Sequence, residues 1–577
     1  MKPSRPLKSA KKKIGRDTSP HFLWLSPYEW LIVLAALLCD INSWGHQFLL
    51  DDIPYIVQNS VLESPKLILK IFASPFLLDA ARYGFMAMYR PLTALTFAVN
   101  VWLGDFKPDG FHLVNRVLHV LICLIIYRIV IRLIPERRSV AVIASLLFAV
   151  HPVQTEAVTY ITGRADVLAM LFFLVAWLSF LRLRSRNQFS GKEFALSLLC
   201  YLLSLLSKED AITWLGVILL TEWVYHAKGK WGCFVEQLRQ HYQIYGGYVG
   251  TTLLFLVVRS WVLKGSITGS IPFILNPLAQ ASIKARLLTG LKIMWEYIGQ
   301  FFWPAHFLPD YSYNQIPLVT SWISPTTLLV IALSLLLILV VFWFYQRCLD
   351  VFFGLGFFCI TYSVVSNIFI PIGTIRADRL LYMPAFGWCL VVAVLYSALW
   401  TKLQTRQSKS ILAVTLAVIV ALLAGRTIDR NRDWQSPETL YLQAFTPMPN
   451  SSKLLNSIGT QLLQQGRSQD AIACFQKALA IGYFEPKMVQ SNLGAALKAS
   501  GDWGGALEQY DSIISKDPTY AAAYFNRGNL YLAEKKYAEA VADYKKALVY
   551  DPQLVPAEIN LKAALERLSE NNPTKKP

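Results

Sequence analysis

The chain has 577 residues, of which 54% are hydrophobic and 16% are charged, and its mean hydropathy is +0.40. A soluble globular protein carries about a quarter charged residues, so this composition excludes a purely soluble enzyme and a disordered or collagen-like chain. The net charge of +18 comes with no nucleic-acid-binding motif, and membrane proteins concentrate basic residues in cytoplasmic loops. The sequence therefore predicts a multi-pass membrane protein that binds no nucleic acid.

The amino-terminal segment, residues 1–28, is a basic tail with seven Lys and Arg residues between Lys2 and Arg16. No small-residue cleavage site follows the first apolar run at 29–43. We therefore expect an uncleaved first transmembrane helix with the tail in the cytoplasm.

Residues 29–425 carry apolar runs, many near the roughly 20 residues that a spanning helix needs. We expect eleven spans, with two interrupted apolar stretches, 89–104 and 285–303, at the outer face. The expected spans are 29–43, 112–134, 139–152, 166–181, 193–207, 211–226, 245–263, 325–346, 351–370, 382–400 and 411–425. This arrangement puts fourteen further basic residues in short cytoplasmic loops, as the positive-inside rule requires, and it puts the carboxyl terminus outside the cytoplasm.

A repeat follows the linker at 426–450. Gly459, Gly494 and Gly528 are 35 and 34 residues apart, and each is followed by Ala twelve residues later and by Phe or Tyr sixteen residues later. This is the tetratricopeptide period, with a small residue where two helices cross and an aromatic ring in the groove between them. Residues 451–570 are predicted to form about three repeats, closed by a capping helix at 553–570. Such an α-solenoid binds peptides or partner helices and does no chemistry itself, so it indicates a protein acceptor or partner.

Six polar segments fall on the outer face in this topology. Ionisable groups at the membrane edge are costly unless they pair or act, so acids and arginines from six segments on one face suggest a site there. Ordinary loop polarity and helix caps explain any one segment taken alone. The segments are HQFLLDDIPYIVQN (46–59), YRPLTALTFAVN (89–100), HPVQTEAVTYITGRAD (151–166), SKEDAITW (207–214), PDYSYNQIP (309–317) and SNIFIPIGTIRADRLLYMP (366–384).

These motifs, in this order and with terminal repeats, resemble the transmembrane and tetratricopeptide-repeat-containing protein O-mannosyltransferases, which belong to the GT-C glycosyltransferase class. The resemblance covers nearly the whole chain. It implies a mostly α-helical membrane domain, a polyprenyl-phosphate-linked sugar as donor and an extracytoplasmic protein hydroxyl as acceptor. The chain departs from the better-known members in its small number of repeats and its long basic tail.

GT-C enzymes carry an acidic pair in the first outer loop, which maps here to Asp51 and Asp52. A Ser or Thr hydroxyl is a poor nucleophile, and a carboxylate can accept its proton as the sugar C1 is attacked. Asp51 is the preferred base by family analogy; alternatively, it caps the helical stretch that follows. Acidic pairs can also bind a divalent cation, although the resemblance requires none.

Arginines in the outer segments are candidates for contacting the lipid phosphate, since the guanidinium fork matches phosphate oxygens. They are Arg376, Arg379, Arg164 and Arg90. Each can instead pair with a neighbour, for example Arg164 with Asp166. His151, Glu156 and Asp166 are candidates for orienting the sugar or the base, or for holding their loop together. Lys208, Glu209 and Asp310 are weaker candidates.

The sequence thus predicts an integral membrane glycosyltransferase that transfers a hexose, by resemblance mannose, to Ser or Thr, with repeats that bind the acceptor or a partner. Two alternatives remain: a GT-C enzyme that glycosylates a lipid or glycan, and a non-enzymatic membrane scaffold for envelope assembly. The number of repeats and the lack of a retention signal favour a bacterial inner membrane over the endoplasmic reticulum.

Overall fold

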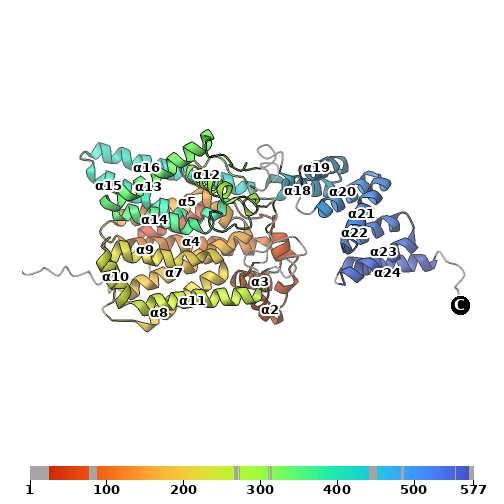
Figure 1. The fold of residues 1–577 in the computed structure, drawn as a ribbon, viewed down its shortest axis with the longest axis horizontal. Coiled ribbons are helices and arrows are strands. Elements are labelled where there is room, and N and C mark those ends of the chain that lie inside the picture. Colours follow the sequence, from red (N-terminus) through yellow and green to blue (C-terminus); the bar gives the residue numbers. More distant parts are fainter. Residues whose placement is uncertain are drawn as a thin grey trace, which may run out of the picture.

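The computed structural model describes residues 25–76, 88–186, 188–264, 271, 273, 275–308, 311, 315–440, 451–482, 486–552 and 554–570. Within these residues the fold is helical and contains no strand. A bundle of apolar helices is followed by an array of shorter helix pairs, which projects from one end of the bundle (Figure 1). This is the predicted fold class, a helical membrane domain followed by a repeat solenoid.

The bundle contains sixteen labelled α-helices among the described residues. They are α1 (Pro27–Cys39), α2 (Ile68–Ala73), α3 (Pro91–Gly104), α4 (Pro108–Leu133), α5 (Arg138–Val150), α6 (Thr155–Val158), α7 (Arg164–Arg184), α8 (Gly191–Ser207), α9 (Trp214–Thr221), α10 (Trp231–Gln240), α11 (Tyr242–Val262), α12 (Ile283–Phe302), α13 (Pro325–Arg347), α14 (Leu349–Ser363), α15 (Ala385–Lys402) and α16 (Arg406–Asp433). Every predicted span overlaps one of these helices, and the basic tail lies outside the described residues except for 25–28.

Among the residues that the structure describes, five helical stretches are long and apolar enough to cross a membrane: Pro108–Leu133, Ile161–Ser185, Pro325–Arg347, Ala385–Lys402 and Arg406–Asp433. A sixth arises if α5 and the stretch Pro152–Val158, bent by 53°, form one broken span. Shorter apolar helices, α1, α3 and α14, accompany them. The count by length is lower than eleven because several apolar helices are shorter than 18 residues.

The helices at the centre of the bundle are more buried than those at its edge. The apolar window of Ile161–Ser185 is 78% buried, whereas the windows of α13 and α16 are 11% and 6% buried. Because α13 and α16 expose apolar side chains almost all round, their surroundings must be lipid. The membrane domain therefore has α7 at its centre and α13 and α16 at its edge.

Local sequence signals set several helix starts. Ser26 and Glu29 form a capping box at the start of α1, and Ser324 caps α13 immediately before Pro325. At the start of α3, Pro91 occupies the first helical position, where its missing N–H costs nothing.

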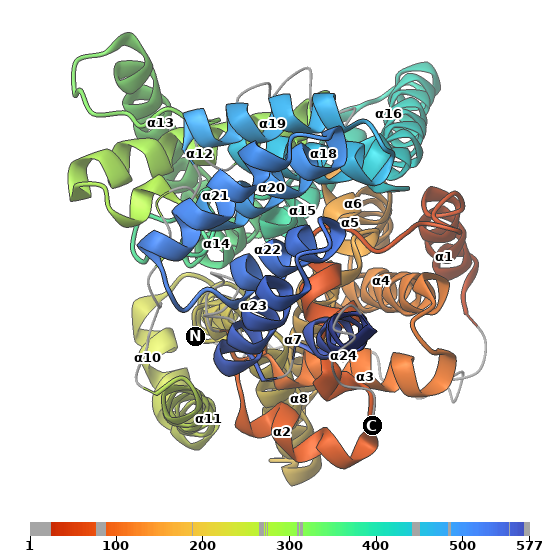
Figure 2. The same cartoon turned by 90° about the vertical axis from the view of Figure 1, so that its right-hand side faces the viewer.

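Not every helix of the bundle follows the common direction. Viewed from the side of the repeats, α3 and α12 lie across the other bundle helices, at the end that faces the array (Figure 2). They correspond to the interrupted apolar stretches at 89–104 and 285–303.

The two ends of the bundle differ in chemistry. At the end away from the repeats, Arg184 bonds to Glu222 and to Gln237 of α10. At the opposite end, Leu308 packs against Leu454, at the start of the repeat array. Leu49 of the first outer loop packs with Trp434 and Leu440, which lead into the repeats, so this loop and the start of the repeat array lie at the same end.

The repeat array consists of α18 (Ser452–Gln464), α19 (Ser468–Ile481), α20 (Pro486–Ser500), α21 (Trp503–Lys516), α22 (Ala521–Ala533), α23 (Tyr537–Tyr550) and α24 (Val555–Glu570). A Cβ at Gly459 would lie 2.7 Å from the ring of Phe475, and Gly494 and Gly528 stand in the same relation to the rings sixteen residues later, Tyr510 and Tyr544. Glycine is required at each position because the aromatic ring fills the helix crossing. The helix α24 packs against α23 at the end of the described array.

Candidate active site

The first outer loop places two neighbouring carboxylates in different surroundings. Asp52 is buried, and its carboxylate accepts hydrogen bonds from the backbone N–H groups of Leu49 and Thr162, each at 2.9 Å. Burial raises the pKa of Asp52 to about 8, although the two backbone donors act in the opposite direction. Both oxygens of Asp52 are therefore engaged in joining this loop to the segment before α7.

Asp51 is half-buried, and its backbone N–H donates to the hydroxyl of Tyr160 at 2.7 Å. Among the residues that the structure describes, its carboxylate has no hydrogen-bond or ion-pair partner. The preceding residue, Leu50, has a φ of +46°, a left-handed conformation that is uncommon for a residue other than glycine and that clusters at functional sites. The loop thus holds Asp51 by its backbone and leaves its carboxylate oxygens open to a substrate.

Ion pairs join the start of α3 and the start of α7 to the turn after α8. Arg90 donates to both carboxylate oxygens of Glu209, at 3.0 and 2.8 Å, and Lys208 lies 2.5 Å from Asp166 and 3.2 Å from Asp210. Burial alone would raise the pKa of Glu209, but the neighbouring Arg90 guanidinium lowers it to about 2. The carboxylate of Glu209 is therefore ionised and holds the Arg90 fork in place.

A further ion pair joins Arg379 to Glu156. The guanidinium and the backbone N–H of Arg379 both donate to this buried carboxylate. The side chain of Arg379 remains 27% exposed, while that of Glu156 is 3% exposed. Burial works against the charged form of Arg379, but Glu156, Tyr160 and Asp51 together raise its pKa. One side of Arg379 is thus anchored and the other faces solvent.

Tyr160 joins the acidic pair to Arg379: its hydroxyl accepts the backbone N–H of Asp51 at 2.7 Å, and the Arg379 guanidinium lies 6.0 Å from the centre of its ring. Burial raises the pKa of Tyr55, in the helical turn after the acidic pair, and the charges of Asp51, Arg90, Arg379 and Glu209 act on it as well. The first outer loop, the start of α3, the turn after α8 and the 376–384 segment therefore converge on one region, which we call the outer-face site. Its members are Asp51, Tyr55, Arg90, Glu156, Asp166, Lys208, Glu209 and Arg379.

Other predicted residues are engaged in packing near this site. Arg164 is fully buried and donates to Asn115 at 2.7 Å, to Asn100 at 2.5 Å and to two backbone carbonyls. His151 lies on the ring of Phe301 at 4.5 Å and uses both ring nitrogens in hydrogen bonds to backbone groups. Arg164 and His151 tie helices together and have no exposed polar atom to offer a ligand.

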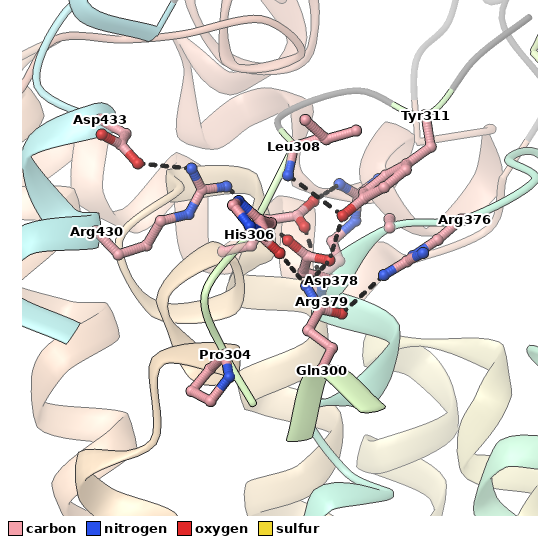
Figure 3. Close-up of polar contacts among 12 residues, drawn as sticks. Gln300, Pro304, His306, Leu308, Tyr311, Arg376, Asp378, Arg379, Arg430 and Asp433 are labelled. Atoms are coloured by element: carbon pink, nitrogen blue, oxygen red, sulfur yellow. Dashed lines mark hydrogen bonds and ion pairs between the residues drawn. The ribbon is translucent and has the colours of Figure 1, made fainter. Parts of the chain in front are cut away.

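Arg376 is held in a second network, shown in Figure 3. Its guanidinium lies over the rings of Tyr297 and Tyr311, at 4.9 and 4.5 Å, and donates to Glu296 at 2.7 Å and to Gln300 at 3.0 Å. These contacts fix the position of the 376–384 segment, which also carries Arg379.

The same network continues through Asp378 to the last apolar helix. The buried carboxylate of Asp378 accepts hydrogen bonds from Gln300 at 2.9 Å and Tyr311 at 3.0 Å. Arg430 of α16 approaches it at 3.9 Å and pairs with Asp433 at 2.7 Å (Figure 3). Burial raises the pKa of Asp378, and the nearby arginines oppose that shift. The network therefore connects the Arg379 segment to the helix that leads into the repeats.

Sequence reasoning missed Tyr160, Gln300 and Arg430. Gln300 lies in an interrupted apolar stretch without a distinctive motif, and Tyr160 belongs to the 151–166 segment, where only charged residues and His151 were candidates. The only signal for Arg430 was the charged run that follows the last apolar segment. Tyr311 belongs to a segment that was singled out, whereas Asp310 of the same segment lies outside the described residues.

Among the described residues, no group of three or more His, Cys, Asp or Glu side chains is arranged to hold a metal ion. The eight cysteines, all free thiols, are scattered through the helices. The described residues therefore form no preformed cation-binding site at Asp51 and Asp52.

Comparison with known proteins bears on both parts of the chain. The tetratricopeptide repeat family model matches residues 521–554, and a second model, described as TPR repeat, matches 494–535. The chain is 29% identical to the protein O-mannosyl-transferase TMTC3 of Mus musculus over 581 residues, which cover 94% of this chain and 62% of that protein. This chain is a relative of the protein O-mannosyl-transferases.

Two further relatives agree. The protein O-mannosyl-transferase Tmtc3 of Drosophila melanogaster is 29% identical over 91% of this chain and 59% of its own length. The human protein O-mannosyl-transferase TMTC4 is 30% identical over 76% of this chain and 64% of its own length. The chain spans about three fifths of the length of these curated relatives. The predicted family resemblance is confirmed, as are the repeats.

Among solved structures, the Cut9–Hcn1 hetero-tetramer of the APC/C matches at 15% identity over 91% of this chain and 100% of that chain. The TM-score is 0.23, too low to compare the folds.

Proposed function

We propose that this chain is a GT-C-type membrane glycosyltransferase that moves mannose from a polyprenyl-phosphate donor to Ser or Thr hydroxyls of extracytoplasmic proteins. The observation that carries the proposal is the half-buried carboxylate of Asp51, which has no hydrogen-bond or ion-pair partner among the described residues and whose charge acts on the nearby Arg379. The names of the relatives support mannose as the sugar and a protein as the acceptor. A scaffold has no need of an uncommitted acid beside paired arginines.

The proposed reaction is a single displacement at the sugar C1. The acceptor hydroxyl oxygen attacks C1, its proton passes to a carboxylate oxygen of Asp51, and the bond from C1 to the phosphate oxygen breaks. The products are the mannosylated Ser or Thr and polyprenyl phosphate, with inversion at C1. General-base assistance of this kind is typically worth about 10²–10⁴ in rate.

Arg379 and Arg90 are the residues we assign to the departing phosphate. Each guanidinium is held by a carboxylate on one side. The exposed fraction of the side chain is 27% for Arg379 and 15% for Arg90. A guanidinium held in this way can donate to phosphate oxygens with little further ordering. This step is written without a cofactor, because a carboxylate accepts the proton and two guanidinium groups stabilise the negative charge on the phosphate.

The remaining predicted residues act as positioning residues in this proposal. Glu156 and Asp166 hold basic partners, Arg379 and Lys208. Arg164, Arg376 and His151 fasten the segments that carry them. Asp52 fastens the loop that presents Asp51.

The proposed topology places the basic tail in the cytoplasm and the repeats outside it. The repeats begin at the same end of the bundle as the outer-face site, which supports delivery of a protein acceptor from that side. The bacterial inner membrane stays a prediction. The relatives named here are animal proteins, so the donor to be tried first is the dolichyl-type lipid.

The proposal can be tested with the full chain in lipid nanodiscs, polyprenyl-phosphate-[³H]mannose and an unfolded acceptor protein. We expect label in the protein that is released by alkaline β-elimination, the reaction of sugars linked to Ser or Thr. Label recovered only in lipid or glycan would establish the alternative acceptor. No transfer from any polyprenyl-linked hexose would favour the scaffold.

A further inference from the structure

Arg116 of α4 is a buried guanidinium with open hydrogen-bond donors. It is 7% exposed, and its Nε and one Nη nitrogen are buried without a hydrogen-bond partner among the described residues. The charges of Asp40 and Asp109 act on it, but neither acid forms an ion pair with it. Its guanidinium lies 4.6 Å from the centre of the exposed Trp44 ring. Because an unpaired charge is costly at the edge of a membrane, the two open donors indicate a missing acceptor.

His46, in the first outer loop, presents a hydrogen-bond acceptor near this guanidinium. Its Nε2 lies 2.9 Å from the backbone carbonyl oxygen of Asn42, so Nε2 carries the proton. Burial lowers the pKa of His46 to about 4, and the charge of Arg116 acts in the same direction. The ring is therefore neutral at pH 7. Its buried Nδ1, which has no partner in the described part of the chain, is an acceptor.

Asp109 presents a second acceptor at the start of α4. Its Oδ1 accepts the backbone N–H of Gly45 at 2.9 Å, and its exposed side chain has no other hydrogen-bond or ion-pair partner among the residues described. The ring of His112, whose two nitrogens are buried without a partner there, lies 5.7 Å from the ring of His46. Asp109, His112 and Arg116 are three and four residues apart, so they share one face of α4.

These groups are ordered with depth in the membrane. The contact with Gly45 places Asp109 beside the first outer loop, and a helix rises about 1.5 Å per residue, so Arg116 lies roughly 10 Å deeper than Asp109. The helices α1 and α4 pack together at one side of the bundle (Figure 2). Deeper still, both helices expose apolar side chains, namely Leu34, Leu37, Leu38, Val117 and Leu121. The order from water inwards is therefore acceptor, guanidinium, apolar surface.

A phospholipid with an ethanolamine head group presents complementary groups in the same order. Its ammonium group, with three N–H donors, matches the carboxylate of Asp109 and the Nδ1 of His46. Its phosphate matches the Nε and Nη edge of Arg116, which can bind two phosphate oxygens at once. Its acyl chains match the apolar surface below. A choline head group has no N–H donor, and a glycerol head group has no positive charge.

We propose that Arg116, His46, His112 and Asp109 bind the head group of a phosphatidylethanolamine molecule at the outer edge of the contact between α1 and α4. The inference is independent of the proposed function, because this site is separate from the outer-face site. Asn115, one residue before Arg116, lies on a different face of α4 and donates to the backbone of Tyr160, on the side of Asp51.

Lipid binding to the full chain in detergent, measured by native mass spectrometry, tests the choice of head group. The probes share the same acyl chains and are phosphatidylethanolamine, its N-methyl and N,N-dimethyl forms, phosphatidylcholine and phosphatidylglycerol. We expect affinity to fall with each methyl group, to about tenfold weaker binding for phosphatidylcholine. Equal binding of the ethanolamine and choline lipids, or tighter binding of phosphatidylglycerol, would overturn the proposal.

Competition identifies the source of the phosphate. O-Phosphoethanolamine, which has no acyl chains, and polyprenyl phosphate should each leave phosphatidylethanolamine bound when added at the same concentration as the lipid. Displacement by O-phosphoethanolamine would replace the lipid with a free phosphate ester. Displacement by polyprenyl phosphate would assign these residues to the sugar donor. Either result would overturn the proposal.

Variants separate the two halves of the head group. Arg116→Gln should weaken binding of the ethanolamine and choline lipids alike, by about tenfold, because both carry the phosphate. Asp109→Asn should reduce the preference for ethanolamine over choline from about tenfold to about threefold. The matched controls are Arg132→Gln, at the other end of α4, and Asp105→Asn, at the end of α3, and both should bind as the wild type does. Unchanged affinity in Arg116→Gln or unchanged preference in Asp109→Asn would refute the site.

Melting distinguishes lipid binding from a packing role of Arg116. Replacing a buried donor that has no partner with an apolar group costs little, so Arg116→Leu should melt at or above the wild type in phosphatidylcholine nanodiscs. Added phosphatidylethanolamine should raise the melting temperature of the wild type and leave that of Arg116→Leu unchanged. An equal rise in both proteins, or no rise in the wild type, would contradict the site.

Discussion

Arg379 and Glu156 lie 223 residues apart in the sequence and form an ion pair in which Glu156 is buried and Arg379 is not. The pair fixes one side of a guanidinium whose other side is exposed to solvent. Arg376, three residues earlier, is enclosed instead by two tyrosine rings, a glutamate and a glutamine. The two arginines of one short segment therefore have different roles, and the difference is measurable.

Arg379→Ala is expected to lower the rate of mannose transfer about 10²- to 10³-fold, because it removes a donor to the developing phosphate charge. It is also expected to lower the unfolding temperature, because it leaves the buried carboxylate of Glu156 without its partner. Arg376→Ala is expected to lower the unfolding temperature, because it leaves Glu296 and Gln300 without their partner. Transfer rate and intrinsic-fluorescence melting on both variants test these expectations. The assignment fails if Arg379→Ala retains wild-type transfer.

Asp52→Ala should destabilise the outer loop. The change leaves the backbone N–H groups of Leu49 and Thr162 without an acceptor, and each buried unsatisfied donor costs about 1–3 kcal/mol. Asp52→Asn, which keeps one acceptor oxygen, should be milder. Melting curves of the two variants in the same detergent measure the difference, and an unchanged midpoint for Asp52→Ala would contradict this role.

The Arg90–Glu209 pair predicts a pH dependence of stability. The pKa of Glu209 is lowered in the folded chain to about 2 from an ordinary value of 4.5. The pair therefore contributes stability that is fully present above about pH 4.5 and is lost as the pH falls towards 2. Glu209→Gln should melt below the wild type at pH 7, and the gap should narrow at pH 3. A gap that stays constant between pH 7 and pH 3 would contradict this reading.

Gly494→Ala is expected to destabilise the repeats by about 1–3 kcal/mol, because the added Cβ would lie 2.7 Å from the ring of Tyr510. Gly504→Ala in the same repeat is the control, since its Cβ would meet no atom closer than 3.9 Å. Limited proteolysis of the repeat array, followed over a range of urea concentrations, reports both. Equal resistance of the two variants would mean that the crossing can open to admit a methyl group.

Much of the fold was predictable because its signals are local. The apolar runs marked helices, and the positions Gly459, Gly494 and Gly528 marked the crossings of the repeats, each against a ring sixteen residues later. The number of helices long enough to span is harder to predict, because a broken pair such as α5 and Pro152–Val158 reads as one apolar run followed by a polar loop.

The site was predictable only in part. Residue types identified carboxylates and arginines on the outer face, but not which of them are already paired. Arg164 and Arg379 looked alike in the sequence, yet Arg164 is fully buried among amides and carbonyls. Partners such as Asn115 and Glu156 come from distant segments of the sequence. Only the three-dimensional packing therefore decides which guanidinium remains available to bind a ligand.

The central claim is that Asp51 is the base. Mannose transfer to an unfolded acceptor protein should be compared for the wild type, Asp51→Asn and Asp105→Asn, an exposed acid whose φ of +61° asparagine also tolerates. The account predicts that Asp51→Asn loses about 10²–10⁴ in rate at unchanged unfolding temperature, while Asp105→Asn stays within about twofold of the wild type. Transfer by Asp51→Asn at the rate of Asp105→Asn would contradict it.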